Sequence, residues 1–313
     1  MIMLLLSFYY GRVPAFRSAS WRVLAMLWLA AAAAIPGRAQ STLAAPSASV
    51  QSRDVFAEVI ALQKKNEAEL DQFSRVQRVE SRKTAGNPGV IDTKVMLLFP
   101  SGIGLSKLPL TQEGKPPDPA VYRAELEKLE KYLSWVVQDG ELQREAFAKA
   151  ERRRKERFEL IEATHQAFAF TLEGKETRAG RTLLRYNMAP RKDYKPNSRM
   201  TTLFTKVRGT IWVDEQTSEL AKVEGEVTED ISLALFLARV NKGSHFMQER
   251  YEIAPGVWEP TFEQYDFDGR KYFMPFSIHE RTFYTDYKRV GPPRESLQLV
   301  RGELSKLPPE KRP

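Results

Sequence analysis

Two stretches of alternating side chains, Thr201–Val213 (TTLFTKVRGTIWV) and Leu220–Val227 (LAKVEGEV), lie on either side of the polar segment Asp214–Ser218. Apolar and polar residues alternate in both stretches, and this two-residue period is that of a β-strand with one buried face. A short polar segment between two such strands is typical of a hairpin. The pair therefore predicts antiparallel β-structure in this part of the chain.

The alternation continues on both sides of this pair, from Gln166 to Tyr287. The dipeptide Asp268-Gly269 predicts a two-residue hairpin turn, whereas the apolar run Ile231–Val240 (ISLALFLARV) predicts a short helix. Together these signals predict an antiparallel meander. Its other strands are expected at Ala167–Leu172, Thr182–Met188, His245–Ile253, Val257–Phe267 and Lys271–Tyr287.

Helical periodicity dominates the part of the chain before this meander. Apolar side chains recur at helical spacing in Asp54–Phe73, Ala120–Val137 and Glu141–Ile161. One further hairpin is expected from Arg75–Arg82 and Ile91–Phe99, followed by a long loop at residues 100–119. Antiparallel strands with helices on one face predict the α+β class, as a layered sheet or a half-open barrel.

The helix Glu141–Ile161 contains a basic run, Glu151–Arg157 (ERRRKER). Such a run can bind anionic lipid or nucleic acid. Because acidic residues stand at both ends and within the segment, a solvated helix face is the favoured interpretation.

The N-terminus has the order of parts expected of a secretory signal peptide. Three arginines precede the apolar run Val23–Ile35, and the small residues Gly37 and Ala39 come before Gln40. The run is about 13 residues long, which is too short to span ~30 Å of hydrocarbon comfortably. We therefore predict export to the periplasm, with an inner-membrane anchor at residues 23–35 as the alternative.

These signals divide the chain into four parts. We expect a signal peptide at 1–39, a linker at 40–53, a single β domain at 54–289 and a flexible C-terminal tail at 290–313. The β domain carries a charged helical insertion at about 105–160.

Composition excludes several classes of function. The chain has no cysteine, so disulfides, thiolate metal sites and cysteine nucleophiles are absent. The formal charge is +8, but the first 39 residues contain four arginines and no acid, so the remainder carries about +4. This charge is too small to indicate a nucleic-acid partner.

No motif of an enzyme is present. The sequence lacks G-x-S-x-G, a Walker loop and G-x-G-x-x-G, and His165, His245 and His279 have no metal-ligand spacing. Asp266 and Asp268 are paired acids that could serve a hydrolase, but the expected turn explains Asp268 better. We predict neither an enzyme nor a metal or cofactor, with an unrecognised hydrolase as a lesser alternative.

Aromatic side chains are concentrated in the second half of the chain. They can fill a core or line a concave apolar site for an acyl chain or peptide. On the strand that contains Phe246, the residues Gln248, Arg250 and Glu252 share its face, which predicts contact with solvent or a partner. The candidates for the lining of a ligand cavity are Trp212, Phe246, Tyr251, Trp258, Phe262, Tyr265, Phe276 and Phe283.

One hairpin resembles that of a known family. Gly209–Asp214 (GTIWVD) followed by Glu219–Glu224 (ELAKVE) resembles the G-x-(I/L)-W-(V/I)-D…L…K-V-E hairpin of outer-membrane lipoprotein-sorting proteins, the Lol-type periplasmic carrier superfamily. Gly180–Tyr186 resembles the strand before that hairpin, and Tyr251–Pro260 resembles the strand pair after it. The resemblance covers roughly residues 54–82 and 168–289.

The resemblance implies a strongly curved antiparallel sheet, a half-open barrel covered by helices, with a cavity for lipoprotein acyl chains. The helical insertion is a departure from the small carriers, and no functional residue is carried over. The expected function is to bind a lipid or lipoprotein acyl chain in the concave sheet, as carrier or sensor. The alternative is a structural or protein-interaction module of the envelope with a filled core; the sequence leaves the oligomeric state open.

Overall fold

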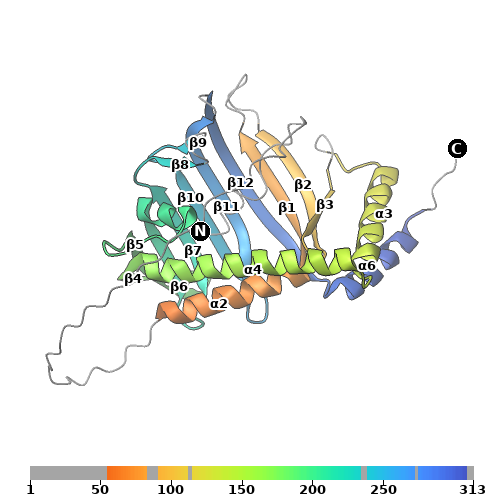
Figure 1. Ribbon diagram of the computed structural model, residues 1–313, viewed down its shortest axis with the longest axis horizontal. Coiled ribbons are helices and arrows are strands. Elements are labelled where there is room, and N and C mark those ends of the chain that lie inside the picture. Colours follow the sequence, from red (N-terminus) through yellow and green to blue (C-terminus); the bar gives the residue numbers. More distant parts are fainter. Residues whose placement is uncertain (1–54, 83–90, 112–114, 234–237, 272–273, 309–313) are drawn as a thin grey trace, which may run out of the picture.

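The computed structural model describes residues 55–82, 91–111, 115–233, 238–271 and 274–308. The predicted signal peptide, the linker and the alternative anchor at 23–35 lie outside the described residues. Strands form one large sheet, and helices lie along one of its faces (Figure 1).

The strands are β1 (Phe73–Arg82), β2 (Ile91–Pro100), β3 (Leu105–Pro109), β4 (Phe168–Arg178), β5 (Arg181–Pro190), β6 (Val207–Asp214), β7 (Leu220–Val227), β8 (Ile231–Leu233), β9 (Ala238–Val240), β10 (His245–Ala254), β11 (Val257–Lys271) and β12 (Met274–Arg289). The helices are α2 (Val55–Glu69), α3 (Pro119–Val136), α4 (Glu141–Ala167), α5 (Arg199–Thr202) and α6 (Pro293–Lys306), with short 3₁₀ turns η1 (Leu70–Gln72) and η2 (Leu203–Lys206).

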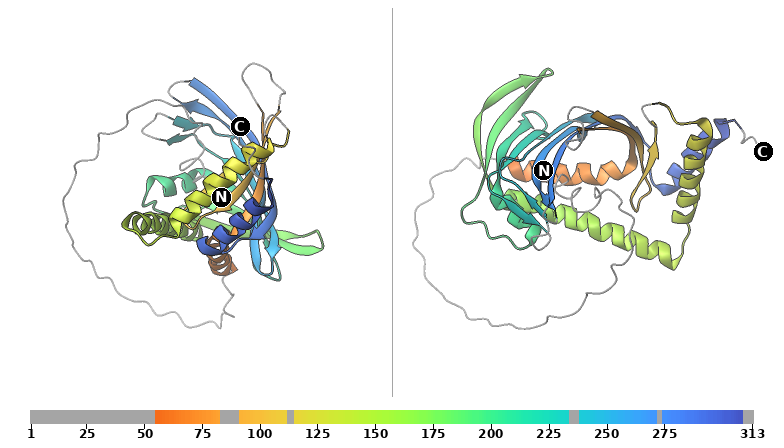
Figure 2. Two further views of the ribbon diagram at one scale, coloured as in Figure 1. Left: turned by 90° about the vertical axis from the view of Figure 1, so that its right-hand side faces the viewer. Right: turned by 90° about the horizontal axis from the view of Figure 1, so that it is seen from above.

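The sheet is antiparallel and open. Its described strands follow the order β3-β2-β1-β12-β11-β10-β7-β6-β5-β4, with β8 and β9 paired beside β11. The first strand of the body, β1, pairs with the last, β12, so the two ends of the domain meet inside the sheet. Seen from above, the strands curve around α2 (Figure 2). The predicted α+β class, with a curved open sheet covered by helices, is confirmed.

Two glycines allow close packing at the β6–β7 hairpin. Gly209 and Gly225 are register partners, and the ring of Phe246 from β10 lies over Gly225. A Cβ at Gly209 would overlap the backbone of Glu224, and a Cβ at Gly225 would overlap that ring. The hairpin therefore depends on two residues without side chains.

We expect Gly209→Ala to lower the free energy of unfolding by about 3 kcal/mol, because the added methyl group meets backbone that cannot turn away. Gly174→Ala on β4 is the matched control: a Cβ there has nothing within 4 Å, and alanine is favoured over glycine in a strand by about 0.5 kcal/mol or more. Urea denaturation of both variants measures the difference. If Gly209→Ala and Gly174→Ala unfold with the same free energy, a glycine is not required at position 209.

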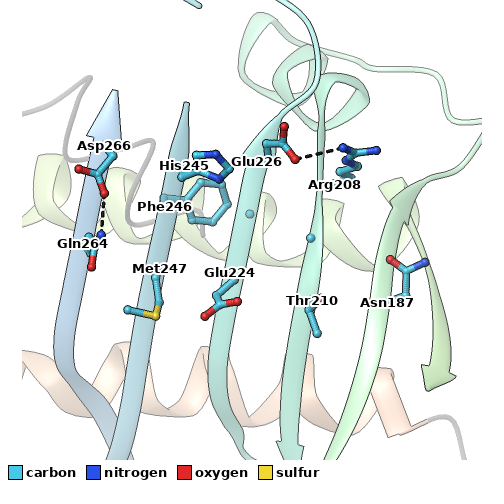
Figure 3. A pocket seen from close by; sticks show the side chains of 12 residues that line it. Asn187, Arg208, Thr210, Glu224, Glu226, His245, Phe246, Met247, Gln264 and Asp266 are labelled. Carbon is cyan, nitrogen blue, oxygen red and sulfur yellow. Dashed lines mark hydrogen bonds and ion pairs between the residues drawn. The ribbon is translucent and has the colours of Figure 1, made fainter. Parts of the chain in front are cut away.

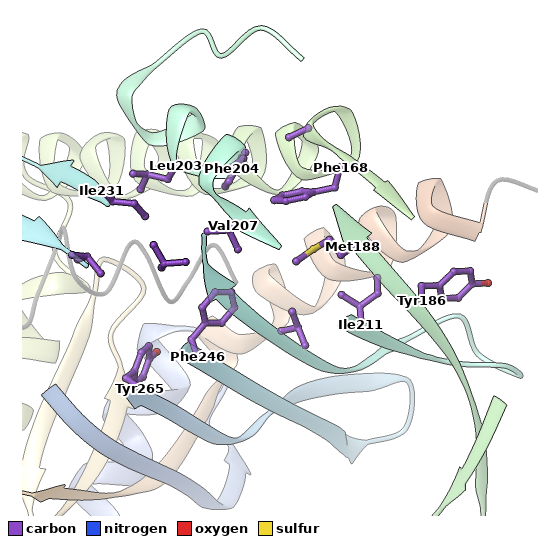
Figure 4. Packing of buried hydrophobic residues seen from close by; sticks show 14 of the residues in the cluster. Phe168, Tyr186, Met188, Leu203, Phe204, Val207, Ile211, Ile231, Phe246 and Tyr265 are labelled. Carbon is purple, nitrogen blue, oxygen red and sulfur yellow. The ribbon is translucent and has the colours of Figure 1, made fainter. Parts of the chain in front are cut away.

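The main core lies between the sheet and the helices (Figure 4). Phe168, at the junction of α4 and β4, is fully buried and packs against Phe204 and Phe170 with ring centroids 5.7 Å and 6.4 Å apart. Phe56 of α2 stacks on Phe170 at 3.8 Å. Helices α2 and α4 are thus attached to the same end of the sheet, over β4 to β7.

A second core lies at the opposite end of the sheet and corrects the expected C-terminal tail. Instead of a flexible segment at 290–313, α6 buries Leu297 and Val300 against Leu129 and Leu133 of α3. Ser296, in the first turn of α6, donates to the Val290 and Gly291 carbonyls and so ties the helix to the end of β12.

Four local predictions are wrong. The first six residues of the strand expected at Thr201–Val213 lie in α5 and η2. The loop expected at 100–119 contains β3, which pairs with β2. The apolar run at 231–240 is not a helix in its described residues but the strands β8 and β9. Asp268-Gly269 is not a turn, because both residues lie inside β11 and pair with β12. Gly269 is needed there since a Cβ would overlap the Arg239 carbonyl of β9.

Candidate functional site

An apolar cleft lies between the helices α2 and α4 and the concave face of the sheet. Its volume is about 100 Å³. Apolar side chains line most of it, while polar and charged groups gather toward the end of α2. The apolar residues are Phe56, Val59, Ile60, Ile161, Phe170, Met188, Ile211, Leu220 and Val223, and the polar ones are Gln63, Glu67, Thr164, His165, Gln248 and Arg250.

A second, larger cleft follows along α4, and we call it the basic cleft. Its volume is about 660 Å³, within the range of ~300–1,000 Å³ typical of ligand sites. It is bounded by α4, the end of α2 with η1, the start of β1 and the loop after β2. Its lining residues are Glu67, Leu70, Asp71, Arg75, Gly102, Ile103, Gly104, Leu105, Lys149, Ala150, Arg153, Arg154, Glu156 and Arg157.

The basic run of α4 supplies most of the positive charge of this cleft. Arg153, Arg154 and Arg157 share one face of the helix at i, i+1 and i+4 and are half-buried, whereas Arg152 and Lys155 are exposed. The favoured interpretation as a solvated face therefore holds for only one side of the run.

Glu67 is common to the two clefts and is held by Arg157, whose Nε donates to its Oε1 at 2.5 Å. Burial raises the pKa of the Glu67 carboxyl, and the Arg157 guanidinium opposes this rise. Beside it, Asn66 is fully buried; it donates to Glu219 Oε2 at 2.8 Å and accepts from the Trp258 amide at 3.3 Å. The last turn of α2 is therefore attached to the sheet by polar contacts.

The sheet beneath these residues has a polar rather than an apolar inner face. Arg250 donates to Gln248 Oε1 at 3.2 Å and to the Trp258 carbonyl at 2.9 Å, and Gln248 donates to Glu263 Oε1 at 2.9 Å. Tyr265 and Tyr284 also donate to Glu263, at 3.3 Å and 3.0 Å. The predicted solvent contact of Gln248 and Arg250 is wrong: they are 1% and 6% exposed.

Glu259 is the least satisfied member of this polar face. It is 1% exposed, and neither carboxylate oxygen has a hydrogen-bond partner among the described residues. Its closest cation is Arg250, with Nη2 3.6 Å from Oε2. Burial raises the pKa of the Glu259 carboxyl to about 8 against the opposing effect of Arg250, so the group is mostly neutral at pH 7.

The opposite face of the sheet carries a polar groove of about 580 Å³ across β5, β6, β7, β10 and β11 (Figure 3). His245 and His279 are both register partners of Asp266, and His279 Nδ1 lies 2.9 Å from Asp266 Oδ1. Burial acts to raise the pKa of Asp266, but the hydrogen bonds from Gln264 and His279 outweigh it and lower that pKa. No cluster that could hold a metal ion occurs among the described residues.

The eight aromatic candidates fall into separate places. Phe246 and Tyr265 belong to the main core. Trp212 and Trp258 form a small separate cluster with Leu183 and Ala221, and Tyr251 is 37% exposed. Phe262 and Phe283 pack on each other at 5.0 Å, and Phe276 lies against Gly269. None of the eight lines the apolar or the basic cleft, so their contact with a ligand stays a prediction.

The residues that do line the clefts were missed because they come from elements far apart in the sequence: α2 and η1, α4, the strands β4 to β7, the polar positions of β1 and β10, and the loop between β2 and β3. The only signal in the sequence was the run Glu151–Arg157, whose spacing places arginines on two faces of a helix. No helix in the described ranges has the length and apolarity required to cross a membrane.

No protein-family model matches the chain, and no curated protein matches its sequence. Its structure is similar to that of a "putative outer membrane lipoprotein-sorting protein domain" from Vibrio parahaemolyticus, at 10% identity and a TM-score of 0.34, covering 80% of this chain and 100% of that one.

Two further solved structures are similar to the chain. A LolA superfamily protein from Nitrosomonas europaea has 11% identity and a TM-score of 0.31, covering 72% of this chain and 90% of that one. A DUF1329 family protein from Desulfovibrio piger has 10% identity and a TM-score of 0.28, covering 75% and 91%. The first two names belong to the superfamily that the β6–β7 hairpin resembles. At TM-scores below 0.5 the likeness carries no functional argument.

Proposed function

We propose that this chain is an exported protein of the bacterial envelope that binds an apolar ligand, a lipid or acyl chain, between α2, α4 and the concave sheet. The observation that carries the proposal is the apolar cleft itself, which lies between two helices and the sheet and shares the lining residue Glu67 with a larger cleft. The N-terminal sequence, with its basic flank and short apolar run, supports export to the periplasm.

The apolar cleft must widen to accept such a ligand. Its volume of about 100 Å³ is below the ~300 Å³ at which pockets for drug-sized ligands begin. Few residues of the two covering helices are buried: Val59, Asn66 and Glu67 in α2, and Gln143 and Ala167 in α4. A shift of these helices away from the sheet would widen the cleft. Such a site suits a carrier, which shelters the ligand, or a sensor. In a sensor, a helix displaced by the ligand changes the surface that the protein presents to a partner.

A neutral apolar fluorophore such as N-phenyl-1-naphthylamine tests this site. We expect saturable binding to the parent protein and at least 10-fold weaker binding to Ile60→Trp, because the indole fills the cleft from α2. Ala61→Trp is the matched control, since Ala61 is exposed on the same helix and its variant should bind as the parent does.

Thermal unfolding of both variants controls for loss of the fold. The same affinity in all three proteins would place the probe elsewhere and contradict the site. Absence of saturable binding to the parent would favour the alternative, a structural or protein-interaction module, which the dense packing of the main core also fits.

A further inference from the structure

We propose that the basic cleft holds the anionic group of an amphiphilic ligand, a phosphate or carboxylate, while the apolar chain of that ligand runs along α4 into the apolar cleft. This inference rests on the proposed function, because it names the chemical class of the ligand for the same concave site.

The charges of the basic cleft are not balanced. Five cationic side chains and three acidic ones line it. Two of the acids are already engaged: Asp71 accepts from Arg154 Nη2 at 2.9 Å, and Glu67 is held by Arg157. The third, Glu156, is exposed on α4. The cleft therefore offers excess positive charge to whatever enters it.

Arg153 is a cation of the basic cleft that has no carboxylate partner of its own. Its Nη2 donates to the Ile103 carbonyl at 2.8 Å, and it forms no ion pair with any described residue. That contact holds the Arg153 side chain between α4 and the loop after β2. The other N–H groups of the guanidinium stay available for a ligand. A guanidinium presents five donors that match a carboxylate or phosphate in pairs.

Arg75, at the start of β1, is the second such cation. Its residue is 6% exposed, but its contacts are weak: the Phe73 carbonyl at 3.5 Å and the face of Tyr284 at 5.7 Å. No carboxylate of the part of the chain described here lies within ion-pair distance of it. The buried carboxyl on which Arg75 acts is Glu259, whose pKa its charge helps to lower without an ion pair between them. An anionic ligand group would supply a direct partner for this buried guanidinium.

The remainder of the lining indicates an amphiphile rather than a free anion. Leu70, Ile103 and Leu105 give the cleft apolar walls beside its arginines. The basic cleft reaches Arg157 and the apolar cleft begins at Ile161, so only about 6 Å of helix separates them. Glu67 borders both clefts, so the anionic head and the apolar chain of one ligand would lie on either side of the Glu67–Arg157 pair.

The test is displacement of the neutral fluorophore by three competitors below their aggregation concentrations: dodecyl phosphate, 1-dodecanol and inorganic phosphate. We expect dodecyl phosphate to bind the parent at least 10-fold more tightly than dodecanol, and inorganic phosphate to displace nothing at the same concentrations. If dodecyl phosphate and 1-dodecanol bind with equal affinity, the proposal is overturned. Displacement of the fluorophore by inorganic phosphate alone would also overturn it.

Arg153→Gln isolates the contribution of the basic cleft, since it removes the guanidinium charge and keeps a polar side chain at this position. It should weaken dodecyl phosphate binding about 10-fold, close to 1.4 kcal/mol, and leave dodecanol binding unchanged. Arg152→Gln, one residue away on the exposed face of α4, is the matched control and should behave as the parent.

Arg75→Gln provides an independent second variant with the same expected loss, checked for intact folding by its thermal midpoint. If Arg153→Gln and Arg75→Gln both bind dodecyl phosphate as the parent does, the inference is wrong. The proposed function survives failure of this inference if dodecanol and the fluorophore bind the parent and their binding is lost in Ile60→Trp. If neither compound binds the parent, the proposed function itself is wrong.

Discussion

Glu259→Gln is expected to raise the free energy of unfolding by about 3 kcal/mol at pH 7. Glu259 is 1% exposed, and burial raises its pKa in the folded state to about 8, above the ordinary value of 4.5 for a glutamate. Between these two values the folded state holds a proton that the unfolded state has released. Stability is therefore fully retained below about pH 4.5 and falls, by about 1 kcal/mol per pH unit, as the pH rises toward 8.

Urea denaturation of the parent and of Glu259→Gln between pH 5 and pH 8 measures this effect. The parent should lose stability across that range, with Glu67 and Glu219, whose pKa values burial also raises, adding slopes of the same sign. The two proteins should be nearly equal at pH 5 and diverge toward pH 8. A constant difference at every pH would show that Glu259 does not titrate there.

Arg250→Leu is expected to lower the free energy of unfolding by about 4 kcal/mol. Arg250 is 6% exposed; without it the Trp258 carbonyl and Gln248 Oε1 lose their donor, and Glu259 loses the cation that opposes its raised pKa. Arg208→Leu is the matched control, because Arg208 pairs with Glu226 on the exposed face of β6 and such pairs contribute ~1 kcal/mol or less.

The double variant Arg250→Leu, Glu259→Gln separates the charge interaction from the hydrogen bonds. Neighbouring residues that interact are expected to deviate from additivity by ~0.5 kcal/mol or more, so the loss from Arg250→Leu should be smaller in the glutamine background. Strict additivity would mean that Arg250 acts through Trp258 and Gln248 alone.

The strands of the sheet were predictable because alternation is local. The strands β7 and β10 to β12 lie close to their predicted ranges, whereas β6 occupies only the second half of the strand predicted at Thr201–Val213. Asp268-Gly269 shows the limit: the dipeptide is typical of a turn, but the close approach of the Arg239 carbonyl requires a glycine inside β11. The tail was misjudged because the core that α6 completes is built from α3, more than 150 residues away.

The candidate site was much less predictable than the sheet. Gln248 and Arg250 share the strand face of Phe246, and polar residues on such a face normally meet solvent. Here they line the cleft beneath α2 and α4, which come from distant parts of the chain. The aromatic residues that did stand out in the sequence fill cores and separate clusters. Which polar positions are buried depends on tertiary packing, and no local pattern of this sequence encodes it.

Organic extraction and mass spectrometry of the gently purified parent protein, beside Ile60→Trp prepared in the same way, test the central claim most directly. We expect a lipid or fatty acid in the parent extract, near one molecule per chain, and its strong depletion from Ile60→Trp. The same small amount of mixed lipid in both extracts would contradict a ligand site between α2, α4 and the curved sheet.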